Sequence, residues 1–161
     1  MLAVLTGCSG GSSAQPSASS QTPQVINGIT VPPEPDSVAN ATLLGVDSNN
    51  NGVRDDVDRQ IATLYGTDAN RYAAALQAAK SDQDYLTANG DPVKSTAATA
   101  RSVIAGACIS RTFNSTWLEG SKAIDTISPL TFNTQERMAA YRATSGASTE
   151  VATPIPAKPC Q

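Results

Sequence analysis

Apolar residues recur at intervals of three and four positions through most of the chain after residue 50, which is the spacing of helices that each bury one face. The first such run is followed by Gly66, a residue type that is common just after the end of a helix. It places four apolar residues on one face: Val53, Val57, Ile61 and Leu64. We therefore predict a helix over residues 55–65.

Capping residues mark the next two helices. Asp68 can cap a helix that ends near Asn89-Gly90, and Asp91-Pro92 supplies a cap followed by the proline favoured at the first helical position. The apolar face of the former contains Tyr72, Leu76, Ala79 and Leu86. That of the latter contains Val93, Ala97, Ala100, Ile104 and Cys108, and we expect this helix to be central.

Two capping-box patterns predict the remaining helices. Thr116-x-x-Glu119 opens a short helix that we expect to stop at Ser128-Pro129. Asn133-x-x-Glu136 opens a last helix, which ends near Ser145-Gly146. The apolar residues of this last helix are Met138 and Tyr141.

The segment before the helices is less regular. Residues 25–36 contain Asn27-Gly28 and three prolines, which predict a turn followed by a polyproline stretch, either an arm laid on the domain or further linker. Residues 40–46 bring the first apolar cluster, which we interpret as a short helical turn that docks Leu43 and Leu44.

Composition supports a helical core. Hydrophobic residues make up 40% of the chain, but many are alanines and only 4% of the chain is aromatic, so the layers should be thin and closely spaced. We predict an all-α fold: a small bundle of about four to five helices.

Charge and histidine content exclude two classes of function. The formal charge of -3 is uneven, because residues 1–58 hold six acids and a single arginine, and no basic run or basic stripe occurs elsewhere. The chain therefore lacks the electrostatic pattern of a nucleic-acid binder. The sequence has no histidine, which excludes serine and cysteine nucleophiles activated by histidine.

The chain opens with a short apolar segment that ends in Leu5-Thr6-Gly7-Cys8. These four residues resemble the lipobox of bacterial lipoproteins, in which the cysteine is acylated and becomes the mature N-terminus. The resemblance implies an exported protein anchored by lipid on Cys8, in the outer membrane of a cell with two membranes, because Ser9 follows the cysteine. The apolar stretch is shorter than the usual signal-peptide core of about 7–15 residues, which favours a start upstream of Met1.

A tether is expected behind Cys8. Residues 9–24 are rich in glycine, serine, proline and glutamine and cannot bury enough apolar surface to fold. The alternative is a disordered N-terminus with an incidental cysteine. The predicted organisation is a signal remnant with the lipidated cysteine over residues 1–8, a tether and proline-rich arm over 9–36, and a helical domain over 37–161.

Cys108 and Cys160 are the remaining cysteines, and we predict a disulfide between them, because export places the chain where disulfides persist. Such a bond would also pin the proline-rich C-terminal segment, which would otherwise fray. Two free buried thiols are the alternative.

The stretch from Asp47 to Asp58 is the one segment whose residue order indicates a defined chemistry. Calcium takes six to eight oxygen ligands, so a loop must wrap it with alternate side chains, turn at a glycine and then offer a backbone carbonyl. This stretch has Gly52 at its sixth position. Its candidate ligands, at positions one, three, five, seven, nine and twelve, are Asp47, Asn49, Asn51, the Val53 carbonyl, Asp55 and Asp58.

This order resembles the calcium loop of EF-hands and, more closely, the loops of thrombospondin type 3 repeats and dockerins. The resemblance implies one Ca²⁺ site built by those six residues. It covers only twelve residues, and the sequence has neither an entering helix before Gly45 nor a second loop, so the motif is half of an EF-hand. Three charged ligands imply weak binding, with a dissociation constant of about 10⁻⁴–10⁻³ M.

A metal-free turn is the alternative for this loop, since asparagine and aspartate side chains also bond their own backbone and cap helices. Two further stretches, Asn51–Val57 and Asn133–Arg137, resemble segments of exported bacterial proteins of unknown activity. That resemblance implies no reaction.

These features favour a calcium-binding, lipid-anchored module of the cell envelope with a structural or interaction role. Its expected partners are the membrane and an envelope protein; the oligomeric state stays open. One alternative is a glycoside or peptidoglycan hydrolase with paired carboxylates drawn from Asp55, Asp56, Asp58, Glu119 and Asp125. Another is a metal-free exported helical protein.

Overall fold

A computed structural model of the chain describes residues 22–113, 117–149 and 152–161. Cys8, the segment from residue 9 to 21 and Thr116 lie outside the described residues. The predictions of a lipidated cysteine and of a flexible tether up to residue 21 therefore stay predictions.

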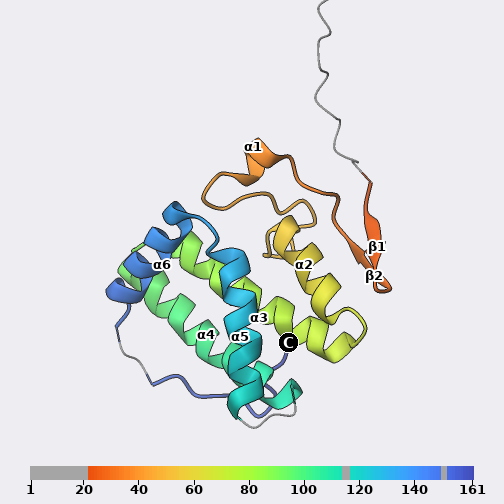
Figure 1. Cartoon of the computed structure of the whole chain (residues 1–161). Helices are drawn as coiled ribbons and strands as arrows, with labels where there is room; N and C mark the ends of the chain where they lie inside the picture. Colours follow the sequence, from red (N-terminus) through yellow and green to blue (C-terminus); the bar gives the residue numbers. More distant parts are fainter. Residues whose placement is uncertain (1–21, 114–116, 150–151) are drawn as a thin grey trace, which may run out of the picture.

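The all-α prediction is confirmed, with a small two-stranded sheet added (Figure 1). Five helices of 11 to 21 residues form the bundle and a single-turn helix precedes them. In chain order the elements are β1 (Gln24–Ile26), β2 (Ile29–Val31), α1 (Ser37–Asn40), α2 (Asp55–Tyr65), α3 (Ala69–Ala88), α4 (Pro92–Thr112), α5 (Trp117–Thr131) and α6 (Gln135–Ala147).

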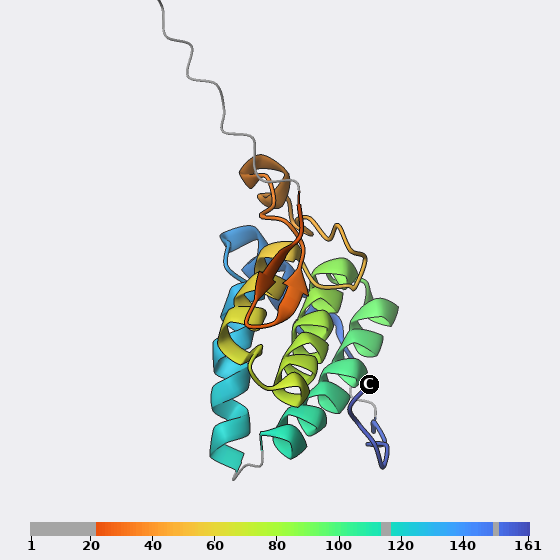
Figure 2. The same cartoon turned by 90° about the vertical axis from the view of Figure 1, so that its right-hand side faces the viewer.

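Helix α3 is the central helix, because it packs against α2, α4, α5 and α6. The prediction that α4 is central was wrong, since α4 lies against α3, α5 and α6 and makes no comparable contact with α2. Figure 2 shows α3 and α4 side by side with α5 across from them. Alanines line much of the buried side of α3, and their small side chains allow several helices to approach it closely.

Capping residues explain where α3 and α4 begin, and both starts agree with the sequence prediction. The Asp68 carboxylate accepts hydrogen bonds from the backbone of Asn70 and Arg71 at the start of α3. Asp91 does the same for the Lys94 amide in front of α4, whose first residue is Pro92.

Helix α5 does not stop at Ser128-Pro129, as we predicted, but continues to Thr131. A proline in the last turn of a helix removes one backbone N–H donor. The energetic cost is small when the carbonyls at the end of the helix find other hydrogen-bond partners. The guanidinium of Arg54 donates to the carbonyls of Leu130 and Thr131, at 2.8 and 3.2 Å. A contact more than 70 residues away in sequence thus supports the end of this helix.

The capping box predicted at Asn133 was wrong by one residue. Thr134 is the N-cap of α6 and accepts the Arg137 amide at 3.2 Å. Asn133 instead accepts a hydrogen bond from the Arg137 guanidinium. The buried residues of α6 are Arg137, Ala140 and Thr144, while Met138 is partly buried and Tyr141 is 37% exposed.

The N-terminal arm is a β-hairpin that lies on α2. Its turn is the predicted Asn27-Gly28, where φ is 50° and 82°, and Ile26 pairs with Ile29 across it. The Asn27 amide donates to the carbonyls of Ala62 and Thr63 near the end of α2. Of the two alternatives for this segment, the structure shows the docked arm (Figure 2).

The core comprises two groups of buried side chains. The larger one joins α2, α3, α4 and α5 and contains Val53, Val57, Ile61, Ala74, Ala75, Ala78, Ala79, Cys108, Ile109, Phe113, Ala123 and Ile127. The smaller one joins α3, α4 and α6 through Tyr85, Leu86, Ala98, Phe132 and Ala140, with Leu43 and Met138 against it. Leu44, which we expected to dock beside Leu43, is exposed.

On α4 the buried face is not the predicted one. Val93 is 81% exposed, whereas Cys108 is buried as expected. Leu64 on α2 is also exposed. The α4 residues that face the core are Ser95, Ala98, Ala105, Cys108 and Ile109. Alanine occurs on several sides of this helix, so its hydrophobic spacing alone does not fix its orientation.

The predicted disulfide between Cys108 and Cys160 is present. It fastens the C-terminal segment to α4, and further bonds hold the segment on both sides of the bridge. The Gln77 amide donates to the Pro159 carbonyl at 2.8 Å, and Arg111 donates to the Ala157 carbonyl. Among the helices in the part of the chain that the structure describes, none is long and apolar enough to cross a membrane.

Replacing the exposed half of the bridge, Cys160→Ser, should lower the free energy of unfolding by roughly 4 kcal/mol, because the bond closes a loop across 52 positions and restricts the unfolded chain. Urea unfolding measures this change. Lys158→Ser, in the same exposed segment, is the matched control and should change stability by less than about 0.5 kcal/mol. Alkylation of two further thiols besides Cys8 in the unfolded, unreduced protein would contradict the bridge.

Candidate metal site in the Asp47–Asp58 loop

The loop turns sharply at two residues whose backbone is left-handed. Asn50 has a φ of 56° and Gly52 a φ of 84°. The Asp47 carboxylate lies inside this turn and accepts the backbone N–H groups of Asn51 and Gly52, at 3.1 and 2.9 Å. Position one of the predicted motif therefore closes the loop onto its glycine.

The two asparagines continue the turn toward helix α2. Asn49 Oδ1 accepts the Asn51 amide at 3.1 Å, and Asn51 Oδ1 accepts the Val53 amide at 2.8 Å. The Val53 side chain is buried in the larger core group, which ties the loop to the bundle. The Val57 and Asp58 amides of α2 both bond the Arg54 carbonyl and so leave the Val53 carbonyl to the loop.

Asp58 is the point on which the loop side chains meet. Asp58 is only 1% exposed, although it lies in the first turn of α2. Its Oδ2 accepts the side-chain amides of Asn49 and Asn51, at 3.3 and 2.9 Å, and its Oδ1 accepts the Tyr72 hydroxyl at 2.7 Å. Burial raises the pKa of Tyr72 well above its usual value, and its hydrogen bond to this carboxylate adds to the shift.

Asp55, three residues before Asp58, is the first residue of α2. It is 1% exposed, its carboxylate accepts the Ser48 amide at 3.0 Å, and its own amide donates to the Val46 carbonyl at 2.7 Å. Burial raises the pKa of the Asp55 carboxyl; the charges of Asp47 and Asp58 raise it further, and hydrogen bonds from Ser48 oppose the shift. The three carboxylates are thus near enough to repel one another.

These three carboxylates have no ion-pair partner among the described residues. The stem of Lys80 lies against Gly52, where an added Cβ would come within 2.8 Å of its Cε, but its ammonium group forms no ion pair with them. Neutral N–H and O–H donors and the positive end of the α2 dipole therefore contribute to the compensation of this charge.

Within the described ranges, no group of three or more acidic or cysteine side chains lies close enough to hold a metal by itself. In this loop Asn49 and Asn51 stand between the carboxylates and present Nδ2 to Asp58. A cation bound here would take the place of those two amide hydrogen bonds to Asp58. The side-chain oxygens of Asn49 and Asn51 could then coordinate it, because each has a second lone pair besides the one that accepts a backbone amide.

The metal-free alternative also finds support in this loop, because Asp47, Asn49 and Asn51 bond neighbouring backbone amides. The metal-free alternative also predicted that these side chains cap α2, and this part of the prediction is wrong. The N-cap of α2 is Arg54, which makes no side-chain capping bond. The loop is therefore pre-folded by its own side chains, with a buried carboxylate at its centre.

A buried arginine joins this loop to α5. Arg54 is 0% exposed and forms an ion pair with Asp56, in addition to its bonds to the last carbonyls of α5. Its stem fills the space beside Gly45, where φ is 68° and an added Cβ would come within 2.0 Å of the Arg54 Cδ. Only glycine fits at this point of the chain.

A second buried arginine, Arg137, joins the segment before the loop to α6. It is 2% exposed and donates to the backbone carbonyls of Leu43, Thr42 and Asn40. Burial lowers its pKa, as does the nearby charge of Arg54. In Figure 1 the segment between α1 and α2 passes over the end of the bundle toward α6.

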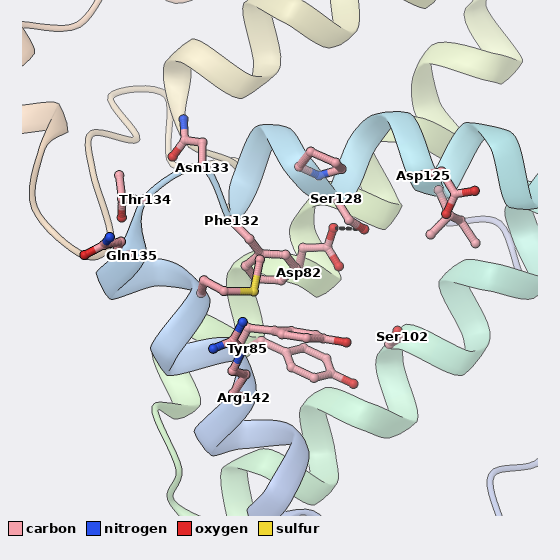
Figure 3. Close-up of a pocket in the computed structure, with 14 residues that line it drawn as sticks. Asp82, Tyr85, Ser102, Asp125, Ser128, Phe132, Asn133, Thr134, Gln135 and Arg142 are labelled. Atoms are coloured by element: carbon pink, nitrogen blue, oxygen red, sulfur yellow. Dashed lines mark hydrogen bonds between the residues drawn. The ribbon is translucent and has the colours of Figure 1, made fainter.

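The acids considered for hydrolysis are separated by these contacts. Asp55 and Asp58 belong to the loop, Asp56 pairs with Arg54, and Glu119 is exposed in the first turn of α5. Asp125 lines a cavity between α3, α4, α5 and α6 together with Asp82, which our sequence analysis did not single out (Figure 3).

The residues that the sequence analysis missed share one signal. Arg137 lies on α6 in line with Ala140 and Thr144, and Asp82 lies on α3 between Ala79 and Leu86. Each is a charged residue on an otherwise buried helical face. Such a residue must find a partner inside the fold, so its position alone indicates a special contact.

No family model matches this chain. The search of curated proteins and the search of solved structures likewise found no match.

Arg137→Met should lower the free energy of unfolding by about 3 kcal/mol or more, because three backbone carbonyls would lose their buried donor. Urea unfolding provides the measurement. Arg142→Met, at an exposed site on the same helix, should change stability by about 0.5 kcal/mol or less. Equal effects of the two substitutions would show that the loop does not depend on Arg137.

Proposed function

We propose that this protein is a calcium-binding, lipid-anchored module of the cell envelope, and that its calcium site has a structural role. The site would be formed by Asp47, Asn49, Asn51, the Val53 carbonyl, Asp55 and Asp58. Bound calcium would stiffen the junction between the N-terminal arm and the helical bundle. The lipid on Cys8 would hold the module at the membrane, where an envelope protein is the expected partner.

The observation that carries this proposal is the Asp58 carboxylate, which is buried without a cationic partner among the described residues. Burial of an ionised carboxylate costs several kcal/mol unless a charge or strong hydrogen bonds compensate it. Here the donors are two side-chain amides and one hydroxyl, and two more carboxylates lie nearby. A divalent cation would compensate all three charges at once.

A structural role fits the position of the loop. Its residues follow directly on the segment held by Arg137, and its last residues open α2, on which the hairpin lies. Calcium would therefore connect the arm, the loop and the bundle at one point. A single weak site acts in proportion to the calcium concentration and suits the calcium-rich exterior of a cell.

Two other functions have less support. Hydrolysis by paired carboxylates would need two acids that face a common cleft. The loop acids are buried and Asp56 is paired with Arg54, so the acids that remain for this alternative are Asp82 and Asp125, which line the cavity between α3, α4, α5 and α6. A metal-free helical module is the remaining alternative, and it differs from our proposal in one measurable property, the response of stability to calcium.

About 5 mM CaCl₂ should raise the free energy of unfolding of the wild-type protein by about 1–2 kcal/mol, which follows from the affinity expected of such a loop. A thermal melt with and without calcium measures the corresponding rise of Tm by several degrees. Asp58→Asn and Asp47→Asn should abolish this calcium-dependent rise, because each removes a charged ligand.

Asp56→Asn is the matched control for calcium. It changes a carboxylate of the same helical turn that pairs with Arg54, so it should lower the baseline Tm but keep the calcium-dependent rise. An unchanged Tm of the wild-type protein at millimolar calcium would refute calcium binding. An equal rise in the Asp58 and Asp47 variants would place the calcium site elsewhere.

Anchoring is tested separately in the cell that encodes the protein. The wild-type protein should sediment with membranes and take up a palmitate analogue, and Cys8→Ser should release it into the soluble fraction, because the lipid is attached at that sulfur. Cys160→Ser is the control and should leave the protein on the membrane. Membrane association of the Cys8 variant equal to wild type would contradict the anchor.

A further inference from the structure

A cavity of about 1060 Å³ lies between α3, α4, α5 and α6, away from the Asp47–Asp58 loop. Its volume is in the range of sites that hold small molecules. Its wall is mixed: eight of its fourteen lining residues carry charged, amide or aliphatic hydroxyl side chains, and the other six include three aromatic residues. Figure 3 shows its principal residues.

Three aromatic rings form one side of this cavity. Tyr85 and Tyr141 are stacked with ring centroids 5.5 Å apart, and Phe132 lies 4.7 Å from Tyr141. The Tyr85 hydroxyl is held by Thr99 on α4 at 3.3 Å. Tyr141 is 37% exposed, so the ring group is reachable from solvent through the cavity.

Asp82 is the charged group that faces these rings. Its Oδ2 accepts the Ser128 hydroxyl at 2.8 Å. Its Oδ1 has no hydrogen-bond partner in the described part of the chain. This oxygen is not fully enclosed by protein atoms, so it opens to the cavity that Asp82 lines. The carboxylate is therefore fixed on one side and available on the other.

No cationic side chain among the described residues forms an ion pair with the Asp82 carboxylate. Burial raises the pKa of Asp82 to about 7, and the only opposing influence is the hydrogen bond from Ser128. Arg142 also lines the cavity, but it does not contribute to this shift, and in the view of Figure 3 it lies at the opposite end from Asp125. Asp125, which lines the same cavity, does not contribute to this shift either.

We propose that this cavity binds a small organic amine, whose ammonium group hydrogen-bonds the free oxygen of Asp82 while its apolar body lies against Tyr85, Phe132 and Tyr141. The inference does not depend on calcium binding or on the lipid anchor, because none of the residues involved belongs to the loop or to the N-terminus.

The charge of the ligand follows from that of the site. A ligand that covers Asp82 removes its remaining water, and a neutral ligand would leave the ionised carboxylate without a counter-charge. An ammonium group supplies both the charge and the N–H donor. Ring faces also attract cations, which adds to the preference for a cationic ligand over an isosteric neutral one.

The test is a titration of the full, disulfide-bonded chain at about pH 8, where Asp82 is ionised, followed by NMR shifts of backbone amides. Three probes share one ring and differ in charge: phenethylamine, phenethyl alcohol and phenylacetate. Phenethylamine should bind with shifts confined to α3, α5 and α6, and at least tenfold more tightly than the alcohol. Phenylacetate should not bind.

Asp82→Asn should weaken phenethylamine at least tenfold and leave phenethyl alcohol unchanged, because the asparagine keeps the shape and the Ser128 contact but loses the charge. Glu119→Gln is the matched control: it removes one acid from the first turn of α5, outside this cavity, and should not change amine binding. Tyr141→Leu, at a part-exposed site, should weaken all ring-containing probes.

Equal affinity for the amine and the alcohol would overturn the proposal, as would undiminished amine binding by the Asp82 variant. So would the absence of saturable phenethylamine binding up to about 20 mM. Tighter binding of N-acetylglucosamine than of phenethylamine would identify the cavity as a site for neutral sugars instead.

Discussion

The buried guanidinium of Arg54 is the contact on which the functional part of this molecule depends. It takes the last carbonyls of α5, pairs with Asp56 and packs its stem against Gly45, so a single side chain joins the loop, the start of α2 and the end of α5. An arginine suits this position because its planar group can donate to several oxygens in fixed directions. Removal of its charge from water is offset only while all these acceptors stay in place.

Arg137 extends the same principle to the preceding segment. It binds the backbone carbonyls of Asn40, Thr42 and Leu43, and with Arg54 it holds an irregular connection in one conformation. The two positive charges lie close enough that Arg54 lowers the pKa of Arg137, while Asp56 and Glu136 offset part of that repulsion. The two arginines therefore hold the segment before the loop and the end of α5, and neither pairs with the carboxylates of Asp47, Asp55 or Asp58.

Burial of charge also distinguishes the two candidate sites. In the loop, Asp58 receives three neutral donors and two further acids lie near it, which favours a divalent cation. In the cavity, Asp82 receives one hydroxyl and opens on aromatic rings, which favours an organic cation. A chain without histidine thus has two acidic environments of different chemistry, one made of oxygen ligands in a loop and one made of a carboxylate and ring faces between helices.

Local chemistry let the sequence alone determine the helical class, the ends of α2 and α3, the start of α4, the pairing of Cys108 with Cys160, and the order of oxygen-bearing residues in the loop. Capping and turn preferences act over a few residues and can be read without the fold. Only the tertiary structure decided which face of the alanine-rich α4 is buried, that α5 passes Pro129, and that Asp82 faces a cavity. These outcomes depend on contacts between residues far apart in sequence, such as Arg54 with Leu130, whose effect no local pattern contains.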